Sequence, residues 1–368
     1  MKIAIIDPVG IKAGMNCYDL GLLNALRQDG IDAFSFSNFN DDRYPRVKQY
    51  PFFLNEKKGV LENTTNFISA HFKALAICKK ENVEWVILHV FSTTPKDLFS
   101  FYGAKLFGRK IIAIIHDVSS LSNEDNAFIR NKMYSLAHIL VVHNTTSYKE
   151  ISGVINTKDK EKLRIIPHGN YVDFVNNENE VNYFRNVISF DPAYKYLLFF
   201  GQIKKVKGLE VLLRAVPLLS QDYKIIIAGR PHRDDFAYYE NIINELNIAD
   251  RVIKIIRFIT DDERDYLFKR CDALILPYRK IFQSGVLLLA MSYGLPVIAS
   301  DLPANKEVIV DGENGILFKD GDYADLADRI KPLFLNENID KIRTKTLETA
   351  KEKYSWKLIA KLYKQLLF

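Results

Sequence analysis

A chain of 368 residues is longer than one hydrophobic core usually supports, so we expect two domains. Hydrophobic residues make up 48% and charged residues 26%, which excludes a disordered or fibrous protein. The net charge of +6 lies mainly in the first half, where residues 1–164 hold 22 Lys/Arg against 17 Asp/Glu. An anionic membrane or lipid pyrophosphate and a merely solvated basic surface both remain open for this half. Nucleic acid is not expected, because no binding motif accompanies the charge.

Three cysteines, Cys17, Cys78 and Cys271, lie far apart and form no CxxC pair. This spacing argues against a disulfide framework and a zinc site, and it indicates a reducing cytosol. Asp7 and Gly10 interrupt the first apolar run too early for a signal peptide. No run reaches the roughly 20 apolar residues that a membrane span needs. We therefore expect a cytoplasmic protein whose only membrane contact would be peripheral, through the N-terminal domain at the inner face.

In the first half, short runs rich in Ile and Val alternate with segments of helical period. This pattern is typical of a parallel sheet covered by helices on both faces. It predicts one doubly wound α/β domain over residues 1–175, with six strands at 2–6, 33–36, 85–90, 111–115, 139–142 and 163–166.

A polar stretch at 172–187 is the predicted linker. The alternation then restarts and predicts a second α/β domain over residues 176–350. An amphipathic C-terminal helix is expected within 351–368, beginning near Ser355. The six strands predicted for the second domain lie at 196–201, 224–228, 252–256, 273–277, 296–299 and 315–318.

Ligands of such open sheets bind beyond the carboxyl ends of the strands. The loop after the strand at 196–201 carries Lys204, Lys205 and Lys207, and a helix is expected to follow Gly208. A phosphate group there would meet ammonium charges and the positive end of a helix. An exposed basic loop with a turn glycine is the alternative interpretation.

A second turn follows the strand at 273–277 and leads into an almost wholly apolar helix. Ser284 and Gly285 stand at the predicted start of this helix. The serine hydroxyl and the amides of Ser284, Gly285 and Val286 would bind an anion. Plain N-capping by Ser284 is the alternative.

Two adjoining segments, MSYGLPVIASD at 291–301 and KEVIVDGENGIL at 306–317, resemble the C-terminal signature of the retaining glycosyltransferases of family 4. The resemblance covers nearly the whole chain and is closest to a branch seen among bacterial surface-polysaccharide enzymes. It extends to Gly201–Gly208, Ala228-Gly229-Arg230, Ile166-Pro167-His168-Gly169 and Ser355-Trp356.

The resemblance implies a GT-B fold, in which two Rossmann-like doubly wound domains face a cleft. It also implies that a sugar passes with retention from a nucleotide-diphosphate donor to a glycan or lipid-linked saccharide acceptor. The C-terminal domain would hold the donor, the N-terminal domain the acceptor, and the last helix would brace the first domain.

By matching position, Lys207 would bind the donor diphosphate, and the amides from Ser284 to Val286 would receive its distal phosphate. Gly201 and Arg230 belong to matching elements and join the nucleotide-sugar-binding candidates. The base would lie near the loop of Arg257, Phe258 and Ile259.

The sequence departs from the family pattern in two respects. Gln202 replaces an arginine, and Lys204 would restore its charge without its bidentate geometry. Ile281 and Leu289 stand where many members carry a glutamate pair, and neither can hydrogen-bond through its side chain. Gln283 is the nearest polar substitute for the sugar contact.

The N-terminal domain offers two site candidates. Gly14, in the loop at 7–14, would let backbone approach the donor phosphate or the acceptor, although a turn glycine is the alternative. His116 follows the strand at 111–115, where the family often has a histidine that touches the transferred sugar.

Three other histidines are less direct candidates. His89 and His143 are interpreted as packing or polar-network residues, and the role of His168 is left open.

Cleavage of the donor requires stabilisation of the departing nucleotide diphosphate. We expect Lys204, Lys207, Ser284 and Gly285 to supply it, with domain closure excluding water.

Asp320-Gly321-Asp322 has the D-x-D form of metal-dependent transferases, but its aspartates are expected to cap a turn and a helix start. No metal and no other cofactor is expected.

Other activities share this fold. An epimerase would require carboxylate acid and base residues, and a phosphorylase of the glycogen type would require a pyridoxal-phosphate lysine; no clear candidate occurs for either. A non-catalytic sugar-nucleotide-binding protein, or a scaffold partner of another glycosyltransferase, is the second hypothesis because the glutamate pair is missing.

Overall fold

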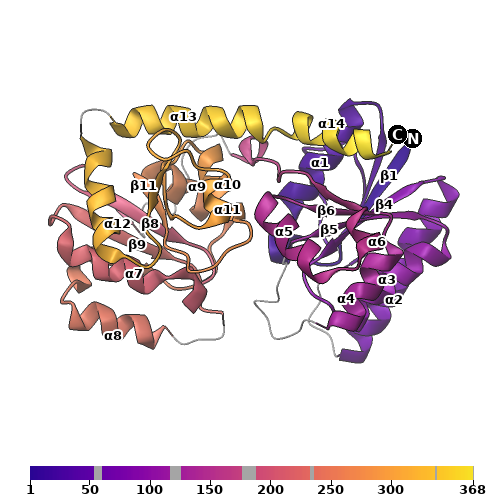
Figure 1. Cartoon of the computed structure of the whole chain (residues 1–368), viewed down its shortest axis with the longest axis horizontal. Helices are drawn as coiled ribbons and strands as arrows, with labels where there is room; N and C mark the ends of the chain where they lie inside the picture. Colours follow the sequence, from indigo (N-terminus) through magenta and orange to yellow (C-terminus); the bar gives the residue numbers. More distant parts are fainter. Residues whose placement is uncertain (54–59, 117–125, 176–187, 233–235, 336–337, 368) are drawn as a thin grey trace. The chain divides into compact units, whose positions relative to one another are not determined.

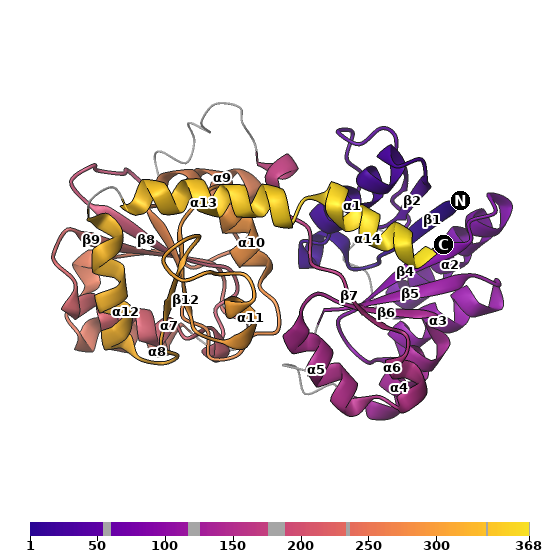
Figure 2. The ribbon, with the colours of Figure 1, turned by 45° about the horizontal axis from the view of Figure 1, so that its top comes forward.

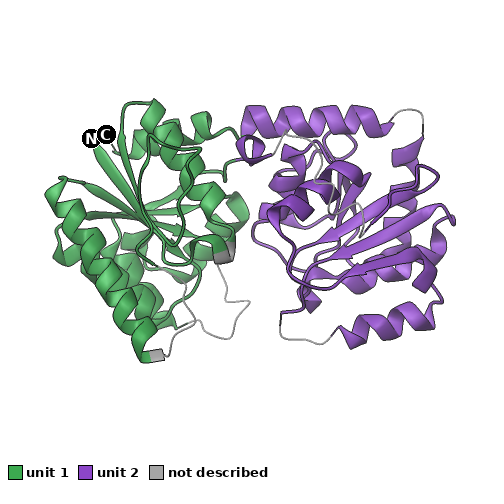
Figure 3. Cartoon of the chain, turned by 180° about the vertical axis from the view of Figure 1, so that it is seen from behind, with its two compact units in different colours: residues 1–169, 354–368 green, residues 170–353 purple. Residues whose placement is uncertain are grey.

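The computed structural model describes residues 1–53, 60–116, 126–175, 188–232, 236–335 and 338–367. The chain forms two compact units, which Figure 3 shows in different colours. Unit 1 comprises residues 1–169 and 354–368, and unit 2 comprises residues 170–353. Of the predicted linker at 172–187, Val172–Phe174 forms a short 3-10 helix, and 176–187 lies outside the described residues.

Unit 1 is built on a parallel sheet of seven strands in the order β3-β2-β1-β4-β5-β6-β7. The prediction of six strands was one short. The missed strand, β3, has only three residues, Lys-Gln-Tyr, and none of them is buried. A strand at the edge of a sheet needs no apolar run, so periodicity could not find it. The strands are β1 (Lys2–Ile6), β2 (Asp32–Phe36), β3 (Lys48–Tyr50), β4 (Trp85–Val90), β5 (Lys110–Ile115), β6 (Ile139–Val142) and β7 (Leu163–Ile165).

Helices cover both faces of this sheet, with α1 and α14 on one face and α2 and α3 on the other (Figure 1). The last helix, α14, lies along α1 (Figure 2), and the hydroxyl oxygens of Tyr18 and Tyr363 are 3.0 Å apart. A Cβ on either Gly21 or Gly169 would overlap the ring of Trp356, so these glycines permit the close packing of α14. The helices are α1 (Asn16–Gln28), α2 (Val60–Lys80), α3 (Pro95–Leu106), α4 (Ala127–Leu136), α5 (Thr145–Val154), α6 (Thr157–Lys160) and α14 (Trp356–Leu367).

Unit 2 has a parallel sheet of six strands in the order β10-β9-β8-β11-β12-β13. All six strands predicted for this half are confirmed to within one residue at each end. The strands are β8 (Lys195–Phe200), β9 (Tyr223–Ala228), β10 (Val252–Ile255), β11 (Ala273–Leu276), β12 (Val297–Ser300) and β13 (Ile316–Phe318). The helices are α7 (Leu209–Ala215), α8 (Ala237–Glu245), α9 (Asp261–Arg270), α10 (Gly285–Ser292), α11 (Pro303–Lys306), α12 (Tyr323–Ile330) and α13 (Asn338–Lys353).

Both sheets therefore have the strand order of a doubly wound Rossmann fold, as predicted. The order reverses between β1 and β4 in unit 1 and between β8 and β11 in unit 2. Ligands of such sheets bind at this point, beyond the carboxyl ends of the strands. Among the described residues, every helix is too short or too polar to span a bilayer.

Candidate active site

In unit 2, the loop after β8 lies directly against the end of β11. Lys204 precedes a short 3-10 turn of residues 205–207, and Gly208 ends the turn with φ of 64°. A Cβ on Gly208 would lie 1.8 Å from the carbonyl oxygen of Pro277. Both the positive φ and the close approach require glycine. This loop therefore carries its lysines to the point where the strand order reverses.

The turn between β11 and α10 is bonded to the same loop. The amide of Arg279 donates a hydrogen bond to the carbonyl oxygen of Val206 at 2.9 Å, and its guanidinium pairs with Glu210 at 3.2 Å. The Lys207 ammonium lies over the ring of Tyr278, 3.7 Å from the ring centroid. This cation–π contact holds the ammonium at the carboxyl edge of the sheet.

The start of α10 is capped and still has donor groups to offer. Ser284 Oγ accepts a hydrogen bond from the amide of Leu287 at 3.2 Å, so the N-capping interpretation is confirmed. The hydroxyl hydrogen is not used by this contact and can still be donated. The amides of Gly285 and Val286 have no partner within the described ranges. A helix start of this kind is suited to an anion.

The loops after β8 and β9 also approach each other closely. A Cβ on Gly229, whose φ is 154°, would lie 1.8 Å from the carbonyl oxygen of Gly201. Gly201 in turn faces α10, because a Cβ built on it would lie 3.8 Å from Val286 Cγ2. Arg230 follows Gly229 and is exposed. The structure thus brings Gly201, the lysine loop and the Ser284–Val286 turn together.

The predicted base contacts follow β10, two strands away from β8 in the sheet. Arg257 pairs with Glu263 at 2.7 Å, and this pairing lowers the pKa of Glu263. Phe258 is 66% exposed, and Ile259 is half-buried. The guanidinium of Arg257 is therefore already engaged by Glu263, whereas Phe258 offers an exposed aromatic ring.

Ile281 and Leu289, which stand in place of the glutamate pair, and the polar substitute Gln283 lie in the turn before α10 or in α10 itself. All three side chains are half-buried. Of the D-x-D aspartates, Asp322 caps a helix start as expected, since it accepts hydrogen bonds from two amides at the start of α12. Asp320 faces Arg279 at 3.9 Å, and burial raises its pKa.

In unit 1, four histidines stand at the carboxyl ends of four neighbouring strands, β4 to β7. We call His89, His116, His143 and His168 the histidine row. The centroids of successive rings are 4.9, 5.3 and 5.4 Å apart. Tyr18 of α1 contacts all four rings at centroid distances of 4.8–5.8 Å.

Hydrogen bonds tie the histidine row to α1 and to the backbone. Asp19 Oδ1 lies 2.8 Å from His89 Nε2, and His89 Nδ1 lies 2.8 Å from His116 Nε2. His143 Nδ1 donates to the carbonyl oxygen of Ile166 at 2.8 Å, and His168 Nδ1 donates to that of Gly169 at 2.6 Å. The interpretation of His89 as a polar-network residue therefore agrees with the structure.

Burial is the main cause of the pKa shifts of most residues in this cluster. It lowers the pKa of His143 to about 3 and that of His168 to about 4, and it keeps the pKa of His116 well below its ordinary value. Burial raises the pKa of Asp19 to about 7, although His89 opposes this. Burial alone would lower the pKa of His89, but Asp19 and Asp7 raise it above its ordinary value.

Asp7, Asp19 and His89 each place one ligand atom within 4.8 Å of the other two, a spacing that a cation would tolerate. However, the two carboxylate oxygens of Asp7 already accept hydrogen bonds from the amides of Val9 and Gly10, both at 2.9 Å. His89 binds Asp19. We therefore assign the three side chains to the hydrogen-bond network.

Gly14 is exposed in unit 1, with φ of 70° and open space where a Cβ would stand. Its conformation alone accounts for a glycine there. The sequence interpretation missed Asp19 and the row as a unit. A signal was present, because each of four successive predicted strands has a histidine within two residues of its end.

Comparisons with known proteins agree with this architecture. Sucrose-phosphate synthase from Thermosynechococcus elongatus covers 100% of this chain and 99% of its own with a TM-score of 0.75 and 18% identity. Anabaena HepE in complex with UDP gives the same coverage with a TM-score of 0.73 and 16% identity. The fold is the predicted GT-B fold of two Rossmann-like domains.

The sequence matches concern activity as well as fold. Residues 181–353 match the family model of glycosyl transferases group 1. An uncharacterized glycosyltransferase of Methanocaldococcus jannaschii is 27% identical over 98% of this chain and 96% of its own length. These matches support a glycosyltransferase with the GT-B fold.

Proposed function

We propose that the chain is a retaining, metal-independent glycosyltransferase of the family 4 type. It moves a sugar from a nucleotide-diphosphate donor to a glycan or lipid-linked saccharide acceptor in surface-polysaccharide synthesis. The observation that carries the proposal is the junction of two loops, where Gly208 touches Pro277 and the Arg279 amide binds Val206.

The junction supports binding of a diphosphate. Lys204, Lys207 and the first amides of α10 surround one edge of the sheet with positive charge and N–H dipoles. Such groups stabilise the negative charge that develops on a departing nucleotide diphosphate. The UDP complex of HepE, which shares the fold, makes UDP-sugars the first donors to test.

Nucleotide release tests this function. Purified protein is incubated with UDP-, GDP- and dTDP-sugars, with and without a lipid-linked saccharide acceptor. We expect release with one donor, accelerated by acceptor. Binding of a donor without turnover, over a broad range of acceptors, would contradict it and favour a sugar-nucleotide-binding scaffold.

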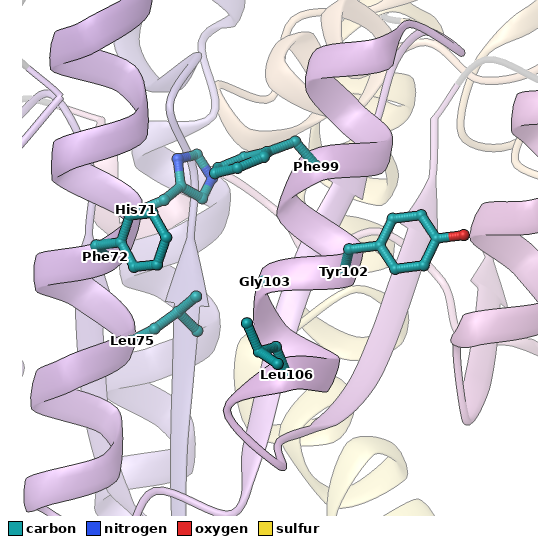
Figure 4. A pocket seen from close by; sticks show the side chains of 7 residues that line it. All are labelled: His71, Phe72, Leu75, Phe99, Tyr102, Gly103 and Leu106. Atoms are coloured by element: carbon teal, nitrogen blue, oxygen red, sulfur yellow. The ribbon is translucent and has the colours of Figure 1, made fainter.

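For the acceptor side, we propose that unit 1 contacts an anionic membrane surface. A pocket of about 230 Å³ lies between α2 and α3, where their side chains face each other (Figure 4). It is almost wholly apolar, and its residues include Phe72, Tyr102 and Leu106, which are 46%, 45% and 80% exposed.

Lysines on the two helices and a buried histidine in the lining of the pocket suit a lipid. Exposed lysines on the same helices, Lys73, Lys96 and Lys105, would meet phosphate headgroups. In the floor, His71 donates from Nδ1 to the carbonyl oxygen of Phe67 and accepts from Ser100, and burial lowers its pKa to about 4. The floor is thus neutral, which favours apolar chains.

Sedimentation with vesicles tests the contact. We expect binding to vesicles that contain an anionic phospholipid and little binding to zwitterionic ones. Leu106→Ser should weaken the binding, whereas Leu335→Ser, which changes a 57% exposed leucine of unit 2, should not. Equal sedimentation of the two variants would contradict this role of the pocket.

A further inference from the structure

A buried hydrogen-bond chain runs in unit 1 from α1 to the carboxyl end of β5. It passes from Asp19 Oδ1 to His89 Nε2 and from His89 Nδ1 to His116 Nε2, each step spanning 2.8 Å. The side chains of Asp19 and His89 are 0% and 2% exposed, so water does not compete for these contacts. His116 is half-buried and forms the outer end of the chain.

The chemistry of the inner residues determines where the hydrogens lie. Above about pH 7, the value to which burial raises the pKa of Asp19, its carboxylate is ionised and only accepts, so His89 must carry a hydrogen on Nε2. A neutral His89 then has a lone pair on Nδ1, which accepts from the Nε2–H of His116. This arrangement leaves a lone pair on His116 Nδ1, for which the described part of the chain offers no partner.

The other two members of the histidine row differ in this respect. His143 and His168 carry their hydrogen on Nδ1, because that atom faces a backbone carbonyl oxygen in each case. A carbonyl oxygen cannot change its role, whereas a carboxylate–histidine pair can gain or lose a proton. Within the row, the tautomer of His116 is thus set by titratable side chains.

We propose that Asp19 and His89 are positioning residues that keep the hydrogen of His116 on Nε2, so that His116 Nδ1 accepts a hydrogen bond from a hydroxyl group of the sugar substrate. The inference rests on the proposed glycosyl transfer, which supplies a substrate rich in hydroxyl groups. Partners of this kind orient histidines in other sites by fixing which ring nitrogen is protonated.

Proton uptake would reverse the arrangement. When His89 gains a proton on Nδ1, it donates to His116 Nε2, and His116 must move its own hydrogen to Nδ1. Asp19 and Asp7 favour the charged His89, whereas burial keeps His116 neutral. Recognition of the hydroxyl is therefore lost as the pH falls. The titratable groups that face the chain are Asp7, Asp19, Tyr18, His143, His168 and Tyr363.

Nitrogen NMR of histidine-labelled protein tests the tautomer without any assay of activity. In mildly alkaline solution, we expect His116 to show a protonated Nε2 and a bare Nδ1. His89→Gln keeps a donor near the position of Nε2 but removes the partner of His116, so the two tautomers of His116 should mix. A bare Nε2 on His116 in the wild-type protein, or an unchanged His116 spectrum in His89→Gln, would overturn the proposal.

Kinetics test the consequence. We expect His89→Gln to lower kcat about 10- to 100-fold, the range typical of residues that orient another group, with the KM of the donor unchanged. Asp19→Asn should move the acid limb of the kcat profile to lower pH, because the charged His89 loses its counter-ion. His143→Asn, a matched change in the same row, should leave kcat and the position of the acid limb at wild-type values.

The outcomes separate the two proposals. If the wild-type protein turns over no sugar nucleotide, the proposed function fails, and the NMR experiment still decides the tautomer. If it is active and Asp19→Asn and His143→Asn give the same pH profile, Asp19 does not act through His116.

Discussion

The α-carbon of Gly208 lies so close to the carbonyl oxygen of Pro277 that a Cβ would approach this oxygen to 1.8 Å. The loops that follow the neighbouring strands β8 and β11 are therefore in direct backbone contact. The close contact would supply the rigidity that the proposed phosphate-binding edge requires, since its donors must point to one place before the ligand arrives.

Gly208→Ala should therefore destabilise unit 2 by more than backbone strain alone. A residue with a Cβ at positive φ costs about 1 kcal/mol, and the overlap with Pro277 should add about 2 kcal/mol or more. Gly312→Ala is the matched control, since Gly312 has φ of 79° and open space around it. Urea unfolding followed by circular dichroism measures both losses. Equal losses would show that the Pro277 contact is not tight.

Lys207→Ala should lower kcat/KM for the donor about 10- to 100-fold. The reason is the loss of a charge-assisted contact with the diphosphate, worth about 1.5–3 kcal/mol. Lys205→Ala, which removes an exposed lysine from the same loop, should change it by less than about threefold. Unchanged turnover in Lys207→Ala would remove this residue from the donor site.

Excess chelator should leave turnover intact. Under the proposed function, lysine ammonium groups and helix amides take the place that a divalent cation has in other transferases, and the D-x-D aspartates are engaged by Arg279 and by the start of α12. The measurement compares nucleotide release with EDTA, with added Mg²⁺ and with neither. Complete loss of activity in EDTA, restored by Mg²⁺, would contradict a metal-independent reaction.

Sequence periodicity predicted the central strands because each is a largely apolar run of mostly buried residues. The same reasoning put Lys207 and Ser284 at the carboxyl edge of one sheet. Periodicity could not predict that the loops of Lys207 and Ser284 meet, because the contact of Gly208 with Pro277 depends on a crossover that pairs β8 with β11. Asp19 was missed for a similar reason, since a helical aspartate is normally solvated and only the fold brings it to His89.

Acid should destabilise unit 1 through its buried histidines. The pKa values of His143, His168 and His71 are about 3, 4 and 4 in the folded protein, against about 6.5 in the unfolded chain. Below about pH 6.5 the unfolded state therefore binds more protons, and stability falls by up to about 1.4 kcal/mol per pH unit for each histidine. The buried Asp19–His89 pair opposes one of these losses, because the pKa of each partner is raised and the pair takes up a proton in the folded state.

Tryptophan fluorescence isolates this effect, because both tryptophans of the sequence, Trp85 and Trp356, are buried in unit 1. Urea titrations between about pH 7 and about pH 5 should show a falling free energy of unfolding for the wild-type protein. In His143→Asn, which keeps a donor for the Ile166 carbonyl oxygen, the fall should be smaller by about 1 kcal/mol per pH unit. If the wild-type protein and His143→Asn showed the same pH dependence of stability, His143 would take up its proton equally well in the folded and the unfolded state. The conclusion that His143 is kept neutral by burial would then be wrong.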